Sequence, residues 1–229
     1  MNLVMLDIDG TLTQSYEYDQ EVFGLAIAEV LRCPPVNADL NGYTDKTSLG
    51  VTQEAIRRIT GRSPEVEEIK EVKRRVLWHL KRMYQESPGI FAEIPGAGCF
   101  LDQLRNLDGT GIAIATGCWR SEALFKVHAS GLMVDGIPMA TSDEHWDRKR
   151  IMTIATQKAE ELYACPGFER IVYVGDGPWD LQTSYSLGYG FIGIGPRLHA
   201  LTNTEVIDWH QDFLDIQAVF ASIALKLET

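Results

Sequence analysis

Residues 3–11 have the sequence LVMLDIDGT, in which an apolar run ends in two carboxylates, Asp7 and Asp9, and a glycine-threonine pair. A short, continuous apolar run predicts a strand that is covered on both faces. Residues two apart share a face of an extended strand, although a turn at Gly10 can redirect Asp9. Two like charges this close are costly unless a cation neutralises them. The stretch therefore predicts a buried strand that ends in a charged site.

Three further apolar runs predict strands of the same kind: GIAIA at 111–115, IVYV at 171–174 and GFIGI at 190–194. Helical apolar spacing lies between the runs, at residues 99–107, 122–130 and 151–162. Strands that alternate with helices indicate a parallel sheet. We therefore predict an α/β protein with a Rossmann-like parallel sheet and helices on both faces.

The segment 16–91 differs from the rest, because it contains no convincing buried strand. Its pattern predicts helices over 20–31, 46–60 and 63–86. We expect an α/β catalytic core formed by residues 1–15 and 92–229 and an inserted α-helical cap formed by residues 16–91. Asp45 is predicted to cap the helix that follows it, and a substrate-facing role of its loop is the alternative.

Composition limits the partners and the location that we expect. The formal net charge of the 229 residues is −11, which disfavours a nucleic-acid-binding surface. No apolar run approaches the roughly 18 residues of a membrane span, and we expect neither membrane contact nor a signal peptide. The four cysteines are scattered without a CxxC pair, which favours reduced thiols in the cytoplasm over a disulfide framework or a zinc site. We expect a cytoplasmic monomer or homodimer.

Polar residues follow three of the predicted strands and precede one helix. In open parallel sheets, ligands bind at the carboxyl ends of the strands, so we expect these residues to converge on one rim. They are Asp7 and Asp9, Thr116 and Gly117, Asp176 and Asp180 in GDGPWD, and Arg148 and Lys149 in DRKR. Several carboxylates around one point suit a hard cation, and we predict Mg²⁺. No histidine or cysteine cluster indicates zinc.

A cation, a hydroxyl group and a basic side chain can together hold a phosphoryl group and offset its charge. Thr116 is the candidate hydroxyl, and Lys149 or Arg148 is the candidate basic residue. One carboxylate can attack phosphorus, which gives an aspartyl-phosphate. A second carboxylate two residues away can protonate the leaving oxygen and then activate water. This division of labour explains why two acids would share the end of one strand.

These motifs resemble a known family. DIDGT at 7–11, IAIATG at 112–117 and VGDGPWD at 174–180 resemble the first, second and fourth motifs of the haloacid-dehalogenase-like hydrolases. GYTD at 42–45 and IPGAGCFLDQL at 94–104 are similar to the phosphoglycolate-phosphatase-like members, which carry a helical cap. The resemblance implies a Mg²⁺-dependent phosphatase that acts on a small phosphorylated metabolite through an aspartyl-phosphate.

The resemblance also implies roles for single residues. Asp7 would be the nucleophile and a metal ligand. Asp9 would be the general acid and base, with its backbone carbonyl on the metal. Asp176 would bind Mg²⁺ directly, with support from Asp180.

The remaining implied roles concern the phosphate group. Thr116 and Gly117 would bind phosphate. The basic residue of the third motif is ambiguous. Lys149, which matches the usual residue type of that motif, is the first choice, and Arg148, as a phosphate-binding residue, is the rival.

Other activities use a similar core. A metal-free dehalogenase or a phosphonatase would be expected to lack an acid at the position of Asp9. A phosphomutase needs the same carboxylates and differs in excluding water from the site. A non-catalytic phosphate-binding module would not need the full set of acids, and this chain has all of them. The physiological substrate does not follow from the sequence.

Overall fold

The computed structural model describes residues 1–34, 36, 42–201 and 208–228. Within these residues, six parallel strands form one sheet in the order β3-β2-β1-β4-β5-β6. The strands are β1 Asn2–Leu6, β2 Thr110–Ala115, β3 Met139–Ala140, β4 Ile171–Gly175, β5 Gly190–Ile194 and β6 Asp208–His210. The strand predicted from the opening stretch therefore lies in the middle of the sheet, with neighbours on both sides.

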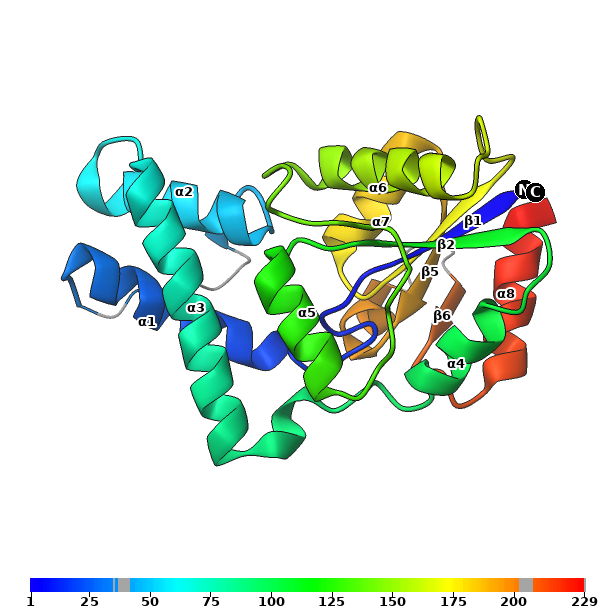
Figure 1. Ribbon diagram of the computed structural model, residues 1–229, viewed down its shortest axis with the longest axis horizontal. Coiled ribbons are helices and arrows are strands. Elements are labelled where there is room, and N and C mark those ends of the chain that lie inside the picture. Colours follow the sequence, from blue (N-terminus) through cyan, green and yellow to red (C-terminus); the bar gives the residue numbers. More distant parts are fainter. Residues whose placement is uncertain (35, 37–41, 202–207, 229) are drawn as a thin grey trace.

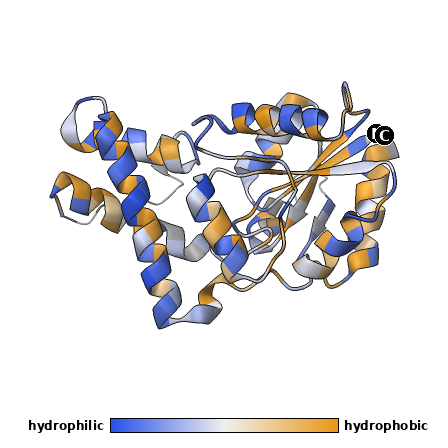
Figure 2. Cartoon of the chain, viewed as in Figure 1, coloured by the Kyte–Doolittle hydropathy of each residue, from blue (hydrophilic) through white to orange (hydrophobic). Residues whose placement is uncertain are grey.

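Helices cover both faces of the sheet (Figure 1). One face packs against α4 Ala97–Leu104, α5 Arg120–Ala129 and α8 Ile216–Glu228. The other face packs against α6 Arg148–Leu162 and α7 Pro178–Leu187. Alternate residues of β1 point to opposite faces of the sheet. Val4 and Leu6 pack in the hydrophobic cluster on the first face, and Leu3 and Met5 pack in the cluster on the second. Figure 2 shows the resulting pattern, with apolar strands inside and helices that are polar on their outer sides.

Three helices stand beside the sheet as a separate group: α1 Tyr16–Leu31, α2 Ser48–Thr60 and α3 Val66–Glu86 (Figure 1). They share a third hydrophobic cluster, to which each contributes apolar side chains, and Trp119 at the start of α5 closes that cluster from the sheet side. The short helix η2 Pro88–Phe91 leads back to the sheet, and η3 Pro196–Leu201 follows β5. None of the described helices is both long and apolar enough to cross a membrane.

The predicted fold class is confirmed: a parallel α/β sheet with helices on both faces and an inserted helical cap. The exact limits of the cap, 16–91, stay a prediction, and residues 35 and 37–41 of that segment lie outside the described residues.

The strands that the sequence did not predict are β3 and β6, with two and three residues. Strands this short contain too few residues for a periodic signal. The predicted helix cap at Asp45 is wrong. The capping residue of α2 is Thr47, whose hydroxyl oxygen accepts a hydrogen bond from the Gly50 N–H at 3.1 Å. Threonine and aspartate both suit this position, so only the actual start of the helix decides between them.

Candidate active site

The register of the sheet brings the predicted polar residues to one rim. Leu6 at the end of β1 lies opposite Ile114 in β2 and Val174 in β4. Asp7 therefore leaves the sheet beside the ends of both neighbouring strands. One pocket is lined by six of the predicted residues: Asp7, Asp9, Thr116, Gly117, Arg148 and Asp176.

The helices beside the sheet complete this pocket. Their contribution comes from α1, from the segment that leads into α2 and from the first turn of α2: Tyr16, Phe23, Lys46, Thr47, Ser48 and Val51. The cavity has a volume of about 50 Å³. A water molecule needs roughly 10–15 Å³ on this scale, so the pocket has room for a small polar group only.

Asp7, Asp176 and Asp180 form a buried cluster of acids on the β4 side of the pocket. Each offers a carboxylate oxygen within 4.8 Å of the others. Oδ1 of Asp7 and Oδ1 of Asp176 are buried and have no hydrogen-bond partner in the described part of the chain. Burial, together with the charge of Asp180, raises the pKa of Asp7 to about 7. Under-compensated carboxylates of this kind fit a hard divalent cation.

The turn after β1 depends on Gly10, which has φ +77°. A side chain at this position would also collide with the Asp176 carboxylate. Glycine is therefore required twice here, for the backbone conformation and for the close approach of the strand end that carries Asp176.

Arg148, the first residue of α6, reaches the acids. Its Nη1 atom lies 2.8 Å from Oδ1 of Asp180 and 3.9 Å from Oδ2 of Asp7. Its Nη2 atom donates to the carbonyl of Lys46 at 3.0 Å, in the segment before α2. Burial alone would lower the pKa of Arg148, but Asp180 and Asp7 raise it above its usual value. A fixed positive charge therefore stands beside the candidate nucleophile.

Lys149, the sequence's first choice for the basic residue, does not reach the pocket. It is exposed, and its ammonium donates to the carbonyl of Ser186 in α7 at 3.3 Å. The geometry has a local cause. Asp147 caps α6 and accepts a hydrogen bond from the Lys149 N–H at 2.9 Å, so the helix begins at Arg148. Successive helical side chains point about 100° apart, so only one of the two can face the sheet edge.

Thr116 and Gly117 form the loop after β2. Thr116 is buried, and its hydroxyl oxygen accepts a hydrogen bond from the Cys118 N–H at 3.3 Å. A Cβ atom on Gly117 would lie 2.7 Å from Nη2 of Arg148 and 2.8 Å from the Lys46 carbonyl. The absence of a side chain at Gly117 thus lets the arginine and the segment before α2 meet above this loop.

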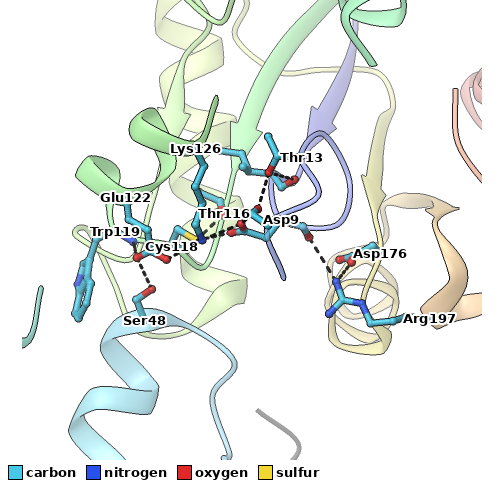
Figure 3. Close-up of polar contacts among 12 residues, drawn as sticks. Asp9, Thr13, Ser48, Thr116, Cys118, Trp119, Glu122, Lys126, Asp176 and Arg197 are labelled. Carbon is cyan, nitrogen blue, oxygen red and sulfur yellow. Dashed lines mark hydrogen bonds and ion pairs between the residues drawn. The ribbon is translucent and has the colours of Figure 1, made fainter. Parts of the chain in front are cut away.

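Asp9 lies in a second buried cluster, on the β2 side of the pocket (Figure 3). The ammonium of Lys126 lies 2.8 Å from Oδ1 of Asp9, and the Cys118 thiol donates to Oδ2 at 2.5 Å. The Ser15 hydroxyl donates to Oδ1. Burial alone would raise the pKa of Asp9, but Lys126 and these hydrogen bonds hold it below its usual value. Asp9 is therefore an ionised, firmly held carboxylate.

Arg197 is a further basic residue in the pocket, and no pattern in the sequence singled it out. It pairs with Asp176, and its guanidinium carbon lies 3.2 Å from the centre of the Tyr16 ring and 5.4 Å from that of Trp179. Arg197 follows β5, so the carboxyl ends of four strands contribute to the site. The GFIGI run identified that strand, but nothing in the sequence marked the residue three positions after it.

Lys126 and Glu122 are two more residues of the site that were not predicted from the sequence. The two residues lie one helical turn apart in α5, with Lys126 Nζ 3.1 Å from Oε1 of Glu122. A Glu-Lys pair at this spacing is usually an exposed salt bridge. The sequence did contain one indication of their role, namely the place of α5 in the chain. This helix follows directly on the Thr116 loop, and its inward-facing residues, Glu122 and Lys126, therefore lie beside the pocket.

The segment around the start of α2 is bonded to the rim of the sheet. The Ser48 N–H donates to the carbonyl of Gly117 at 2.8 Å. The Leu49 N–H donates to the Ser142 hydroxyl at 2.8 Å. Together with the bond from Arg148 to Lys46, these contacts close the pocket on the side of the cap.

A family model described as a haloacid dehalogenase-like hydrolase matches residues 1–184 of the chain. Within this match lie both acid clusters, Thr116 and Arg148, whereas Arg197 lies beyond it. No curated protein matches the sequence.

Solved structures with the same fold include a hydrolase from Pseudomonas syringae, with 20% identity, a TM-score of 0.71 and coverage of 97% of this chain and 99% of that chain. A protein from Bacteroides vulgatus, described as a candidate β-phosphoglucomutase, has 18% identity, a TM-score of 0.69 and coverage of 100% and 91%. A phosphoglycolate phosphatase predicted for Haemophilus somnus has 17% identity, a TM-score of 0.53 and coverage of 95% and 97%. At these identities, the likeness concerns the fold alone.

Proposed function

The chain belongs to the haloacid dehalogenase-like hydrolases, and from this premise we propose that it is a Mg²⁺-dependent phosphatase for a small phosphate monoester. One observation carries the proposal. Asp7 presents a buried oxygen without a hydrogen-bond partner in the described residues, between the acids of β4 and α7 and the guanidinium of Arg148. A carboxylate that is buried, unpartnered and faced by a fixed positive charge suits attack on an anionic phosphoryl group.

The residues present fit a magnesium ion. Asp7 and Asp176 would hold it through the buried oxygens that lack partners, with Asp180 beside them. The Asp9 carbonyl, which accepts a hydrogen bond from Arg197 at 3.5 Å, would be a further oxygen. Both carboxylate oxygens of Asp180 already accept hydrogen bonds, from Arg148 at 2.8 Å and from the Gly177 N–H at 3.0 Å. Asp180 is thus suited to orient the site more than to bind directly. When bound, Mg²⁺ supplies positive charge that lets two anions approach each other.

In the first step, a carboxylate oxygen of Asp7 attacks phosphorus and the bond to the leaving oxygen breaks. When the leaving oxygen needs a proton, Asp9 first takes one up from the substrate's phosphate group or from solvent and then gives it to that oxygen, which leaves Asp9 ionised again. The hydroxyl of Thr116 and the guanidinium of Arg148 bind the phosphoryl oxygens. The product of the step is an aspartyl-phosphate on Asp7.

In the second step, water attacks the phosphorus of the aspartyl-phosphate. Asp9 takes the proton from the water, and the bond between phosphorus and the Asp7 oxygen breaks. Phosphate leaves, and the Asp7 carboxylate is restored. A firmly held, ionised Asp9 suits this second role directly.

The small cavity supports a small substrate. On the cap side lies Lys46, whose ammonium donates to the Tyr43 carbonyl, and Tyr16, Phe23 and Trp179 add aromatic surface. A phosphomutase is the second candidate, supported by the fold shared with the candidate β-phosphoglucomutase. Cytoplasmic location and a monomeric or homodimeric state stay predictions.

The test is a screen of phosphorylated metabolites with Mg²⁺, followed by phosphate release, with Asp7→Asn as the negative control. Phosphoglycolate, sugar phosphates and nucleoside monophosphates belong in the set. We expect stoichiometric phosphate release from at least one compound, together with a phosphate group on Asp7 in mass spectra of acid-quenched enzyme. An isomeric sugar phosphate without phosphate release would establish the mutase instead. No turnover and no phosphate on Asp7 with any compound would contradict both.

A further inference from the structure

Lys126 is an ammonium group buried in the protein interior, with no exposed surface. Its neighbours on the same helix, Ala123 and Val127, are fully buried apolar residues. An apolar side chain would therefore suit this position in the core, whereas a buried charge is costly unless its partners compensate for it. The partners of Lys126 belong to the pocket, which indicates that the charge serves the site.

The ammonium lies at the centre of a group of potential ligands. Its nitrogen is 2.8 Å from Oδ1 of Asp9, 3.1 Å from Oε1 of Glu122 and 3.6 Å from Sγ of Cys118 (Figure 3). Asp9, Cys118 and Glu122 have the spacing of a metal site. Here the Lys126 ammonium takes the place of a metal cation, because its nitrogen is within hydrogen-bonding distance of the carboxylates of Asp9 and Glu122.

Glu122 extends the group toward the cap. Its second oxygen, Oε2, accepts a hydrogen bond from the Ser48 hydroxyl at 3.0 Å and from the Trp119 N–H at 3.3 Å. Ser48 is the first residue of α2, and its own N–H donates to the Gly117 carbonyl. A continuous series of contacts thus runs from the cap helix through Glu122 and Lys126 to Asp9.

We infer that Lys126 is a positioning residue for Asp9 and that Glu122 links this positioning to the docking of α2 through Ser48. The inference rests on the proposed function, in which Asp9 moves protons. Lys126 and Cys118 each hold one oxygen of Asp9, which fixes the rotation of the carboxylate. When Ser48 donates to Glu122, it restrains Glu122 and thereby the ammonium that Glu122 shares with Asp9. The acid-base group is therefore in place when the cap is on the core.

The experiment uses p-nitrophenyl phosphate with Mg²⁺, because p-nitrophenolate leaves without a proton. The first turnover then does not need Asp9, whereas the second step still does. In Lys126→Met, we expect the first turnover to change less than threefold. The steady-state rate should fall roughly 100-fold, the lower end of what general acid-base catalysis contributes. A burst of about one p-nitrophenolate per chain should appear, and phosphate should accumulate on Asp7.

Lys158→Met is the matched control. Lys158 is also an ion-paired helical lysine, held by Glu144 on the opposite face of the sheet, and its loss should leave both phases unchanged. A wild-type steady-state rate in Lys126→Met would overturn the inference, as would equal losses in both phases. If the wild type forms no phosphate on Asp7, the proposed function fails first, and the two failures are thereby distinguished.

Ser48→Ala tests the link to the cap, and it decides the matter if Lys126→Met does not fold. Loss of the hydrogen bond from Ser48 to the Glu122 carboxylate reaches Asp9 only through Glu122 and Lys126, and it predicts a steady-state rate lower by about three- to tenfold, with an unchanged first turnover. In a folded Lys126→Met background, Ser48→Ala should add nothing, since both act through Asp9. Ser130→Ala, which removes a hydroxyl at the end of α5, is the control. A wild-type steady-state rate in Ser48→Ala, or additive losses in the double variant, would refute the link.

Discussion

The two acids of the opening stretch are two residues apart, yet they lie in opposite environments. On the side of Asp7, three buried carboxylates face Arg148, oxygens of Asp7 and Asp176 lack hydrogen-bond partners among the described residues, and the pKa of Asp7 is raised to about 7. On the side of Asp9, both oxygens have partners and the pKa is lowered. A protein can thus build two buried acid clusters of similar size and satisfy the carboxylate oxygens of only one of them. In the incomplete cluster, that of Asp7, Arg148 and Arg197 are present but leave two oxygens without a hydrogen-bond partner among the described residues. The incomplete cluster is the one suited to an external cation and a phosphoryl group.

The strongest test of the difference between the two clusters is the loss of the nucleophile, Asp7. Asp7→Asn should keep the fold and lower kcat by at least about 10⁴-fold, on the order of losses measured for other nucleophiles, because no aspartyl-phosphate can form. Phosphate release and mass spectra of quenched enzyme provide the measurement. Asp102→Asn, at an exposed position of α4, is the control and should match the wild type. Turnover by Asp7→Asn at more than about a hundredth of the wild-type rate would refute a covalent mechanism.

Removal of the metal tests the incomplete cluster as a whole. Chelation should lower kcat by at least about 10³-fold, because several kcal/mol of charge compensation is lost, and Mg²⁺ should restore it. Ca²⁺ should bind without supporting turnover, since its looser geometry misplaces the attacking carboxylate. Calorimetric titration of Mg²⁺ should also show weaker binding to Asp176→Asn. Full activity in excess chelator would show that this cluster needs no external cation.

The two neighbouring basic residues of α6 provide a third test, because only Arg148 lies beside the acids of the incomplete cluster. Arg148→Ala should lower kcat by about 10²- to 10³-fold, the scale of one strong charge-stabilising contact, whereas Lys149→Ala should stay within about twofold. Steady-state rates of the two folded variants are the measurement. If the order were reversed, Lys149 would have to move from Ser186 into the pocket during turnover.

The smallest effect concerns stability without metal. Asp7 holds its proton more tightly in the folded state than in the unfolded state, where its pKa is near 3.8. The free energy of unfolding should therefore fall as the pH rises from about 4 to about 7. Asp9 has the opposite shift, so its stabilising effect is present above its unfolded pKa and is lost toward acid.

In thermal melts at pH 8 with chelator, Asp7→Asn should consequently raise Tm by about 2–5 °C, and Asp9→Asn should lower it by a similar amount. At pH 5, the gain from Asp7→Asn should fall to less than half, because most of the loss of stability in the wild type builds up between pH 5 and pH 7. Shifts of Tm with the same sign for both variants at pH 8 would contradict the opposite pKa shifts of Asp7 and Asp9.

The sequence predicted the incomplete cluster better than the complete one, for a physical reason. Asp7, Thr116 and Asp176 each end a continuous apolar run, and parallel strands bring their ends together by register. Lys126 reaches the site from the middle of a helix, where only packing decides which face is buried. The choice between Arg148 and Lys149 likewise depended on where α6 begins, and helix boundaries are the least certain part of a sequence pattern.

The hydrogen bond from Arg148 to the cap ends on the backbone carbonyl of Lys46, not on its side chain. A carbonyl oxygen is present whichever residue occupies position 46, and the residue at that position lines the pocket. Mutation there can therefore change which compounds enter while the basic residue keeps its anchor. This segment is a place where lineages that descend from one ancestral enzyme can diverge in substrate preference without rebuilding the chemistry beneath it.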